Sequence, residues 1–478
     1  MTYVGATPTT GDFKKLDSIT TSSATTFNLR QGGVAVYPQS ANHCIVSLNG
    51  VIQAPVDAFT IVNDTIVFAS SLASSDVINF ILVLGNVNDI GTPSDDTVST
   101  AKIQANAVTS AKIASGVIPT LRPNAKPLII NGDMVVAQRA TSKASISGGG
   151  YNTVDRYQNN NAGAFIGTWT QTQESLSSGE AFNDGFAKSL KMDCTTANGS
   201  PAANSSNWIQ YGIEGQDLQL LKHGTSSAEK LTLSFWIKAT KTGTNVVRLY
   251  KTDADRSCSQ AYTVSSSNTW EKKVLNFPAD TSGTVIANDN TLGMGINFAI
   301  AMGSNFTSGT LATSWAANTS ANDYVGQVNN ADSTSNNWEI TGVQLEVGEY
   351  TSSTLPPFQH ESYGDNLDRC SRYFQMIAEG NNISIGVGGY YTGANVGMVI
   401  DLRKVMRTTP SITQVSGTNY FDIQANDSTD TFNTFTITDS SQRVVRMYNN
   451  TEVSGTAGHF GMFRTSDSSA KIGLNAEL

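Results

Sequence analysis

Short stretches in which apolar and polar residues alternate dominate the chain, and this period of two predicts β-strands rather than helices. Residues 45–53 are typical of a hairpin, because their central Asn-Gly pair supplies the two positive φ values that a type I′ turn requires. Residues 58–69 show a second hairpin pattern, and residues 77–84 form a mostly apolar run that predicts a strand buried on both faces. We therefore expect residues 1–90 to fold as a small β-sandwich.

Longer strand patterns follow after residue 127. Residues 231–238 alternate as a half-buried strand should, and residues 294–302 alternate even more strictly. Long polar spacers such as residues 195–207 separate these strands. Many strands with turn-rich spacers favour a two-sheet sandwich of the jelly-roll kind.

The pattern changes again after a Pro-Pro pair near residue 357. Residues 367–379 predict a short helix, since their apolar and aromatic residues from Leu367 to Phe374 fall on one helical face. Residues 383–400 and 411–449 are strand-like, which predicts a third β domain at the end of the chain.

A ten-residue repeat lies between the first and second β regions, where Val98-Ser-Thr-Ala-Lys-Ile103 recurs as Val108-Thr-Ser-Ala-Lys-Ile113. The repeat is too short to bury its four apolar positions within one chain, so they would gain burial only against other copies of themselves. Such a pattern favours a stalk made of several chains. An exposed linker rich in Ser and Thr is the alternative.

These patterns predict an all-β fold class with four parts. A chain of 478 residues is long enough to bury several cores without help from disulfides or metals. The expected parts are an N-terminal β domain (1–92), a repeat shaft or linker (93–126), a jelly-roll domain (127–357) and a C-terminal β tip domain (358–478).

The composition excludes two classes of partner. Charged residues make up 14% of the chain, against about 25% in an ordinary globular domain. The net charge of −9 argues against nucleic-acid binding, which needs clustered Lys and Arg. No apolar run is long enough to span a membrane, and residues 1–10 lack a secretory signal, so we expect synthesis in the cytoplasm.

Motifs for catalysis and cofactor binding are missing from the sequence. It contains no GxSxG elbow, no HExxH pair and no phosphate-binding loop. Residues 386–389 lack the spacing of a dinucleotide fingerprint and are expected to form a turn. Asp253 and Asp255 are candidates for a glycosidase pair by proximity alone, and a solvated loop is the expected alternative. We therefore expect neither an enzyme nor a cofactor.

Cysteine and histidine spacing predicts no metal site. The four histidines are scattered, and the four cysteines form no CxxC pair. We expect buried free thiols, with two disulfides as the alternative. The cysteines are Cys44, Cys194, Cys258 and Cys370.

Neutral glycan binding fits this composition better than catalysis. Sugars present hydroxyls and flat CH faces, so their sites use aromatic platforms together with amide and carboxylate hydrogen bonds. Trp169, Trp208 and Trp315 stand among Thr, Asn and Ser in expected loops and are candidate platforms. Local loop packing is the alternative for each of them.

Strand alternation adds a second group of candidates. Because Phe235 is expected to face the core, Trp236 should point to the opposite face of its strand. Arg248 and Tyr250 should point outward from the next strand, which would let them share one face with Trp236. A subunit interface or a covering loop is the alternative for an outward Trp.

Four stretches of the chain resemble bacteriophage tail fibre proteins, especially those of tailed phages that infect marine bacteria and cyanobacteria. The last of the four is the most specific, because its two motifs follow one another in the expected order. The stretches are the 47–55 hairpin, the Ala-Lys-Ile repeat, residues 131–134 with 154–157, and residues 338–348 followed by 368–374.

The middle region also resembles carbohydrate-binding jelly-roll modules, through Asn131-Gly132-Asp133, residues 235–239 and Trp270. Such modules often hold a structural calcium, partly through a carboxylate in their final strand. Residues 341–343 occupy that stretch and offer no such carboxylate, so no metal is expected.

The tail-fibre resemblance implies a homotrimer on the virion, in which Val98, Ile103, Val108 and Ile113 line the shaft. It implies that the N-terminal domain docks on tail adaptor or nozzle proteins. The distal domains would bind a host surface glycan or outer-membrane receptor. An enzymatic tailspike and a capsid head fibre or decoration protein are the alternatives. By position, the tip candidates for host contact are Tyr390, Tyr391, Tyr448, His459 and Phe460.

Overall fold

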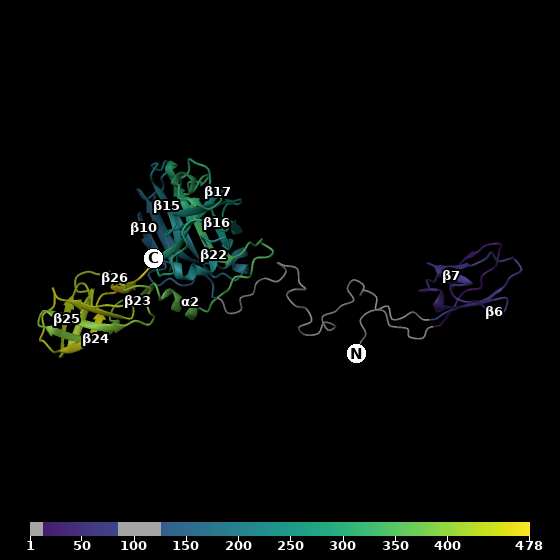
Figure 1. The fold of residues 1–478 in the computed structure, drawn as a ribbon. Coiled ribbons are helices and arrows are strands. Elements are labelled where there is room, and N and C mark those ends of the chain that lie inside the picture. Colours follow the sequence, from purple (N-terminus) through teal and green to yellow (C-terminus); the bar gives the residue numbers. More distant parts are fainter. Residues whose placement is uncertain (1–12, 85–125) are drawn as a thin grey trace. The chain divides into compact units, whose positions relative to one another are not determined.

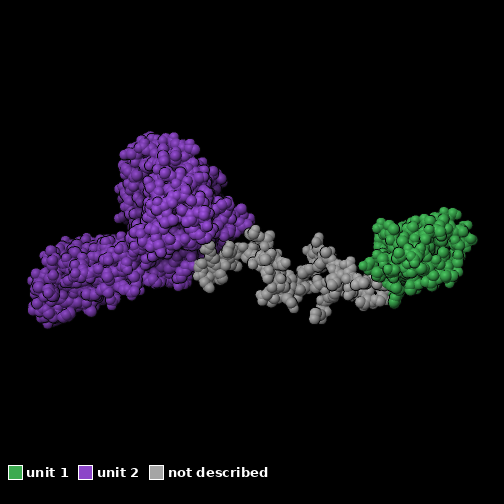
Figure 2. Space-filling model, in the orientation of Figure 1, with its two compact units in different colours: residues 1–117 green, residues 118–478 purple. Residues whose placement is uncertain are grey.

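A computed structural model describes residues 13–84 and 126–478, which belong to two compact units, residues 1–117 and 118–478 (Figures 1 and 2). Antiparallel sheets make up most of the regular structure, which confirms the predicted all-β class. No helix in the described ranges is long and apolar enough to cross a membrane. The four shaft positions lie outside the described residues.

The first unit is the expected small β-sandwich. Its core is formed by residues from two sheets, among them Val46 and Ile81 from the first and Ile66 and Phe68 from the second. The first sheet orders β1 (Lys14–Lys15), β9 (Ile78–Val83), β5 (Cys44–Leu48) and β6 (Val51–Ile52). The second orders β2 (Thr26–Asn28), β8 (Thr65–Phe68) and β7 (Phe59–Val62), and β3 (Arg30–Gln31) pairs with β4 (Val34–Ala35).

Turn chemistry sets the hairpins of this unit. Asn49 and Gly50 have φ values of 53° and 80°, as the Asn-Gly turn between β5 and β6 requires. The second predicted hairpin is also present, as β7 and β8. The expected two-face burial of β9 is wrong, because Ile78, Ile81 and Val83 meet the core while Asn79 is exposed.

The second unit contains a large sandwich, whose two sheets share one core (Figure 1). The six-stranded sheet orders β10 (Ser142–Ile146), β13 (Thr168–Ser175), β14 (Lys188–Thr196), β22 (Asn337–Val347), β16 (Leu231–Ala239) and β19 (Glu271–Phe277). The seven-stranded sheet orders β11 (Gly150–Tyr151), β12 (Tyr157–Ala162), β15 (Ser206–Glu214), β20 (Leu292–Met302), β17 (Gly243–Lys251), β18 (Arg256–Val264) and β21 (Ala316–Ala317).

Both faces of β16 are covered, so the prediction of a half-buried strand is wrong there. On the inner face, Phe235 packs edge-to-face on Phe298, with 5.2 Å between ring centroids. On the outer face, Trp236 packs with Phe186 and Trp270 beside the one-turn helix α1 (Glu180–Asn183).

The same unit ends in a C-terminal sandwich with a core of its own (Figure 1). Its smaller sheet orders β23 (Phe374–Glu379), β32 (Lys471–Asn475) and β26 (Ser411–Val415). Its larger sheet orders β28 (Ser428–Phe432), β27 (Phe421–Ala425), β31 (Phe460–Thr465), β24 (Ser384–Thr392), β25 (Asn395–Asp401), β30 (Val444–Asn449) and β29 (Thr436–Thr438).

Helix α2 (Tyr363–Cys370) leads into this sandwich and begins earlier than the sequence pattern indicates. Ser362 caps it, since its hydroxyl accepts a hydrogen bond from the Asp365 amide at 3.1 Å. The predicted helix at 367–379 is wrong in its second half, because residues 374–379 pair with β32 as strand β23.

A buried network of charges joins the large sandwich to the C-terminal sandwich. Arg156, which precedes β12, and Glu477, near the end of the chain, are only 1% and 2% exposed and form an ion pair. Arg156 also donates to the Gly212 carbonyl at 2.6 Å and stacks on the Tyr373 ring, 3.4 Å from its centroid. The Tyr373 hydroxyl donates in turn to Glu214 at 2.6 Å, so the network crosses between the two sandwiches.

Backbone carbonyls near the end of the chain complete this joint. Arg407 donates to the carbonyl of Ala476 at 2.7 Å and to that of Asn290 in the large sandwich at 2.8 Å. The Tyr151 hydroxyl donates to the Leu478 carbonyl at 2.8 Å. The last residues of the chain are therefore held by both sandwiches.

We expect Glu477→Gln to lower the free energy of unfolding by about 3 kcal/mol, because removing one partner of a buried ion pair leaves the other charge uncompensated. Guanidinium titration measures this loss. Lys404→Met is the control, since the Lys404–Asp368 pair is 43% and 53% exposed and should contribute less than about 1 kcal/mol. Equal losses in the two variants would contradict the role of the joint.

A second test uses Asp155. Burial raises the pKa of its carboxyl group from 3.8 to about 6, although the nearby positive charge of Arg139 acts to lower it. The folded state therefore binds this proton more readily than the unfolded state. Its contribution to stability is full below the unfolded pKa and is lost as the pH rises through 6. The stability of the wild type minus that of Asp155→Asn should fall by roughly 2–3 kcal/mol between pH 4 and pH 7. A difference that does not change with pH would refute this assignment.

Candidate functional site

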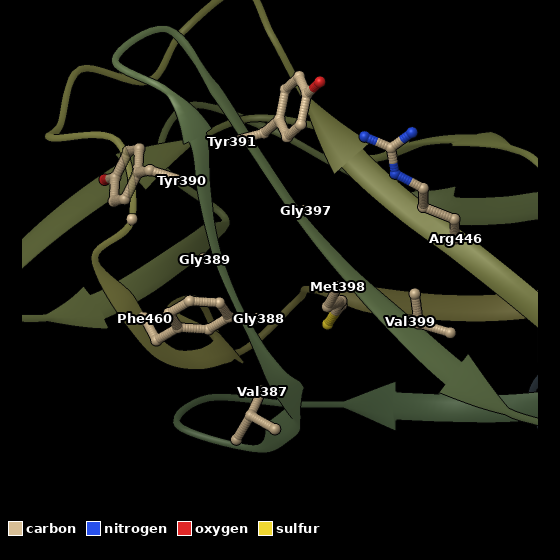
Figure 3. Close-up of a pocket in the computed structure, with 11 residues that line it drawn as sticks. Val387, Gly388, Gly389, Tyr390, Tyr391, Gly397, Met398, Val399, Arg446 and Phe460 are labelled. Atoms are coloured by element: carbon tan, nitrogen blue, oxygen red, sulfur yellow. The ribbon is translucent and has the colours of Figure 1, made fainter.

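A shallow groove of about 550 Å3 lies on the outer face of the larger C-terminal sheet (Figure 3). We call it the glycine groove, because glycines from two neighbouring strands form its floor. The groove is lined by Val387, Gly388, Gly389, Tyr390, Tyr391, Gly397, Met398, Val399, Arg446, Gly458 and Phe460.

Strand register explains why the floor lacks side chains. Gly389 of β24 stands opposite Phe460 of β31 on one side and opposite Gly397 of β25 on the other, and Gly397 stands opposite Tyr448 of β30. One row across the sheet therefore reads aromatic, glycine, glycine, aromatic. Residues 386–389 belong to β24, so the predicted turn at this position is wrong.

Gly389 is sterically required in this row, and a side chain at Gly397 would make only a tight contact. A Cβ on Gly389 would stand 2.5 Å from the His459 carbonyl oxygen and 3.1 Å from the Phe460 ring. A Cβ on Gly397 would stand 3.2 Å from the Met447 carbonyl oxygen. The close approach of the aromatic walls to the backbone therefore depends on the absence of side chains there.

The walls of the groove expose large apolar side chains to solvent. Tyr391, Phe460 and Val387 are 78%, 77% and 76% exposed, and Val399 is 61% exposed. Figure 3 shows the Tyr391 and Phe460 rings at separate points around the glycines. Contiguous apolar exposure of this kind on a folded chain marks a binding surface.

One cation stands at the edge of the groove. The Arg446 guanidinium pairs with Asp439 at 2.8 Å and lies 5.7 Å from the centroid of the Tyr448 ring. This side chain is about one-third exposed, so its remaining N–H groups are open to a ligand. The groove thus combines aromatic faces with a fixed hydrogen-bond donor.

The structure places three of the five tip candidates, Tyr390, Tyr391 and Phe460, in the lining of the glycine groove. Tyr391, Tyr448 and Phe460 share the outer face of the sheet. Tyr390 is buried, and His459 lines a neighbouring pocket of about 190 Å3.

Tyr390 anchors this neighbouring pocket from within the sandwich. Its hydroxyl donates to Asp430 at 2.7 Å, and the Ser454 amide donates to the same oxygen at 2.7 Å. Burial, together with the Asp430 carboxylate, raises the pKa of Tyr390 far above its ordinary value. The polar end of Tyr390 is therefore committed to the protein, and its predicted role in host contact stays a prediction.

The tryptophan candidates hold the large sandwich together. Trp169 and Trp208 lie on β13 and β15, so the prediction that they stand in loops is wrong. Trp169 and Trp315 are buried, and their indole N–H groups donate to the carbonyls of Ile166 at 2.9 Å and Pro278 at 2.8 Å. Neither ring face is open to a sugar. Trp208 is half-buried and donates to its strand neighbour Gln210 at 3.2 Å.

The predicted face shared by Trp236, Arg248 and Tyr250 does not exist. Trp236 lies on β16 and the other two lie on β17, and these strands belong to opposite sheets of the sandwich. Trp236 is covered beside α1, as the covering-loop alternative expected. Arg248 is paired with Asp323 and lies 4.7 Å from the Tyr250 ring centroid.

The two aspartates that were candidates for a glycosidase pair accept hydrogen bonds from the protein itself, and the four cysteines are buried. Asp253 accepts from the Ala287 amide at 2.9 Å, and Asp255 accepts from the Tyr250 hydroxyl at 2.9 Å. The four cysteines are buried and free, as predicted, and burial raises the pKa of Cys44 to about 11. Within residues 13–84 and 126–478, no three His, Cys, Asp or Glu side chains gather as a metal site requires.

Sequence reasoning missed the glycine floor and Arg446. The sequence feature that marks the floor is the pair of glycines Gly389 in β24 and Gly397 in β25, which stand opposite one another in the sheet. Recognising the floor and Arg446 requires the pairing of β24 with β31 and of β25 with β30, and these strands are distant in sequence.

No known protein family and no curated protein matches this chain. Solved structures that match it in part include the enzymatically active domain of tailspike protein 4 of bacteriophage CBA120, at 14% identity and a TM-score of 0.22. A CBM4 structure matches at 10% identity and a TM-score of 0.18. The CBM22-1–GH10 modules of Clostridium thermocellum endo-1,4-beta-D-xylanase 10B match at 8% identity and a TM-score of 0.20.

These matches are partial in both directions. They cover 40%, 34% and 43% of this chain, respectively. The chain spans 19% of the tailspike structure, 82% of the CBM4 structure and 28% of the xylanase structure. The structural neighbours thus include a phage tailspike domain and carbohydrate-binding modules.

Tyr390 and Tyr391 offer a matched test of the two sheet faces. We expect Tyr390→Phe to lower the free energy of unfolding by about 1.5–3 kcal/mol, because it removes a hydrogen bond to a charged, partly buried group. Tyr391→Phe should change it by less than about 0.5 kcal/mol, because that side chain is exposed. Chemical denaturation of both variants measures the difference. A larger loss for Tyr391→Phe would reverse the assigned faces.

Proposed function

We propose that this chain is a receptor-binding fibre protein of a bacteriophage tail and that it binds a host surface glycan in the glycine groove. The observation that carries the proposal is the row of Phe460, Gly389, Gly397 and Tyr448 across the outer face of the sheet. A side-chain-free floor between aromatic walls fits a flat ring.

The chemistry of the groove suits a sugar. The CH face of a sugar ring packs on exposed aromatic rings such as those of Tyr391 and Phe460, while its hydroxyls accept hydrogen bonds from Arg446. The volume of about 550 Å3 lies within the range of small-molecule sites.

The proposal is one of binding without cleavage. Glycoside hydrolysis needs two carboxyl groups on either side of the scissile bond. None of the residues that line the glycine groove is Asp or Glu, and the nearby Asp439 is paired with Arg446. An enzymatic tailspike is the competing function.

The rest of the chain supports presentation of the groove. We assign the N-terminal sandwich to docking on tail adaptor or nozzle proteins, and Val98, Ile103, Val108 and Ile113 to a trimeric shaft. In a trimer, binding at one site raises the effective concentration of the other two sites near a surface that carries many receptors, so weak single sites bind more tightly together. A capsid head fibre would use the same architecture in another place on the virion.

Replacing the aromatic walls tests the proposal directly. We expect Tyr391→Ala combined with Phe460→Ala to weaken binding to purified envelope polysaccharide of the host bacterium at least about tenfold, since each stacking contact is worth about 0.5–1.5 kcal/mol. Surface plasmon resonance measures this loss. Tyr363→Ala is the matched control, because Tyr363 is 59% exposed on α2, away from the groove.

Any of four results would contradict this proposal. Unchanged binding by the double variant would remove the groove from recognition. A change in assembly mass by native mass spectrometry, without a change in polysaccharide binding, would make the apolar face a subunit contact. New reducing ends on incubation with polysaccharide would identify a tailspike. Gold-labelled antibody on whole virions reports location, and labelling of the capsid would exclude a tail fibre.

A further inference from the structure

The sequence contains three Asn-Gly pairs, Asn49-Gly50, Asn131-Gly132 and Asn198-Gly199. An Asn-Gly pair can modify itself, because the backbone nitrogen of the glycine can attack the side-chain carboxamide carbon of the asparagine before it. Glycine favours this attack, since it has no Cβ to hinder the approach. The three pairs stand in different surroundings, which decide which of them reacts.

The first pair is held in an unreactive arrangement. Asn49 Nδ2 donates to Asp76 at 2.8 Å, and Asn49 Oδ1 accepts from the Val77 amide at 2.8 Å. The Gly50 amide, which is the attacking group, donates to Asn79 Oδ1 at 2.7 Å. Both reaction partners are therefore bound to other groups, and the positive φ of Gly50 explains why the turn needs a glycine there.

The second pair is shut off from water, which the reaction consumes. Asn131 is 1% exposed, and its carboxamide is bonded through both ends to the backbone of Val136, at 2.9 Å each. Gly132 has a packing role, because a Cβ there would stand 2.2 Å from the Val343 carbonyl oxygen. The fold thus accounts for this glycine as well.

The third pair lies in the loop between β14 and β15, where the fold makes no such demand on Gly199. A Cβ on Gly199 would meet no atom within 4 Å, and its φ lies outside the left-handed region. The residue is exposed, and its amide has no hydrogen-bond partner among the described residues. A solvent base can therefore reach this nitrogen and remove its proton.

The carboxamide of Asn198 is placed for the attack. Its Oδ1 accepts from the Ser200 amide at 3.1 Å, and this bond closes a ring that includes the Gly199 nitrogen. When that nitrogen attacks Asn198 Cγ, negative charge develops on Oδ1, at which the Ser200 N–H is already aimed. A donor fixed at a developing oxyanion lowers the barrier, so the loop supplies its own catalytic group.

The backbone of Asn198 is anchored on both sides of its Cα. Its amide donates to the Ala331 carbonyl at 2.7 Å, and its carbonyl accepts from Asn329 Nδ2 at 2.8 Å. The anchors limit the motion of the carboxamide relative to the Gly199 nitrogen. Holding two reacting groups in one arrangement raises the rate of the reaction between them.

We infer that Asn198-Gly199 is a self-modification site, at which the asparagine deamidates without an enzyme. The Gly199 nitrogen gives its proton to a solvent base and forms a bond to Asn198 Cγ. The C–N bond of the carboxamide breaks, and its nitrogen takes a proton from water and leaves as ammonia. Water then opens the five-membered imide to aspartate or isoaspartate, and no electrons are gained or lost.

The product changes the attachment of the loop. Both products add a negative charge where the parent side chain is neutral. Isoaspartate also places an extra carbon in the main chain and converts the carbonyl that accepts from Asn329 into a carboxylate. The anchors to Asn329 and Ala331 then no longer fit together, so modification releases the loop from the segment around residue 330.

Peptide mapping by mass spectrometry tests the inference on the full-length protein, sampled during incubation in mildly alkaline buffer. Asn198 should deamidate at least about tenfold faster than Asn49 or Asn131, and faster in the folded protein than in guanidinium at the same pH. Gly199→Ala should slow conversion of Asn198 about tenfold and keep the melting temperature, because the added Cβ hinders the attack and meets no other atom. Gly148→Ala is the matched control, since a Cβ there also meets nothing within 4 Å.

Each outcome decides for or against the inference. Preferential conversion of Asn198 that folding accelerates and that Gly199→Ala slows, with Gly148→Ala unchanged, supports it. Equal rates at the three pairs, an intact Asn198, or a slower reaction in the folded protein than in guanidinium would overturn it. An unchanged rate in Gly199→Ala would also overturn it, because the Gly199 nitrogen would not be the attacking group.

Discussion

A β-strand presents successive side chains to opposite faces of its sheet, and in this protein what covers the second face decides what each residue does. Tyr390 and Tyr391 are neighbours in sequence, yet one is buried and bonded to Asp430 while the other is 78% exposed. Phe235 and Trp236 show the opposite outcome, because the segment around α1 covers the outer face of β16. Sites for external ligands remain only where no second layer covers the sheet.

No second layer covers the glycine groove of the C-terminal sandwich. The central positions of the groove are glycines, which have no side chain beyond a hydrogen atom. Gly389 and Gly397 leave a strip of backbone between Phe460 and Tyr448. Packing density normally opposes a trough of this kind, because the lining atoms lose dispersion contacts on one side. A ligand with flat apolar faces would restore those contacts, which is the physical basis of the proposed binding in the groove.

Local chemistry was predictable from the sequence, and pairing between distant strands was not. The Asn49-Gly50 turn depends only on its own backbone angles, so the hairpin around it was predicted correctly. The placement of Trp236 beside Arg248 assumed that consecutive strands share a sheet, whereas β16 and β17 lie in opposite sheets. The helix prediction at 367–379 failed for a related reason, since pairing with β32 overrides the local period.

The joint between the two sandwiches connects the C-terminal sandwich, and with it the proposed glycine groove, to the large sandwich. Arg156 and Glu477 exclude water from an ion pair whose separation would leave two buried charges without partners. The proposed groove therefore belongs to a sandwich that is held by buried contacts, so a ligand would bind there without the entropy cost of ordering a flexible linker.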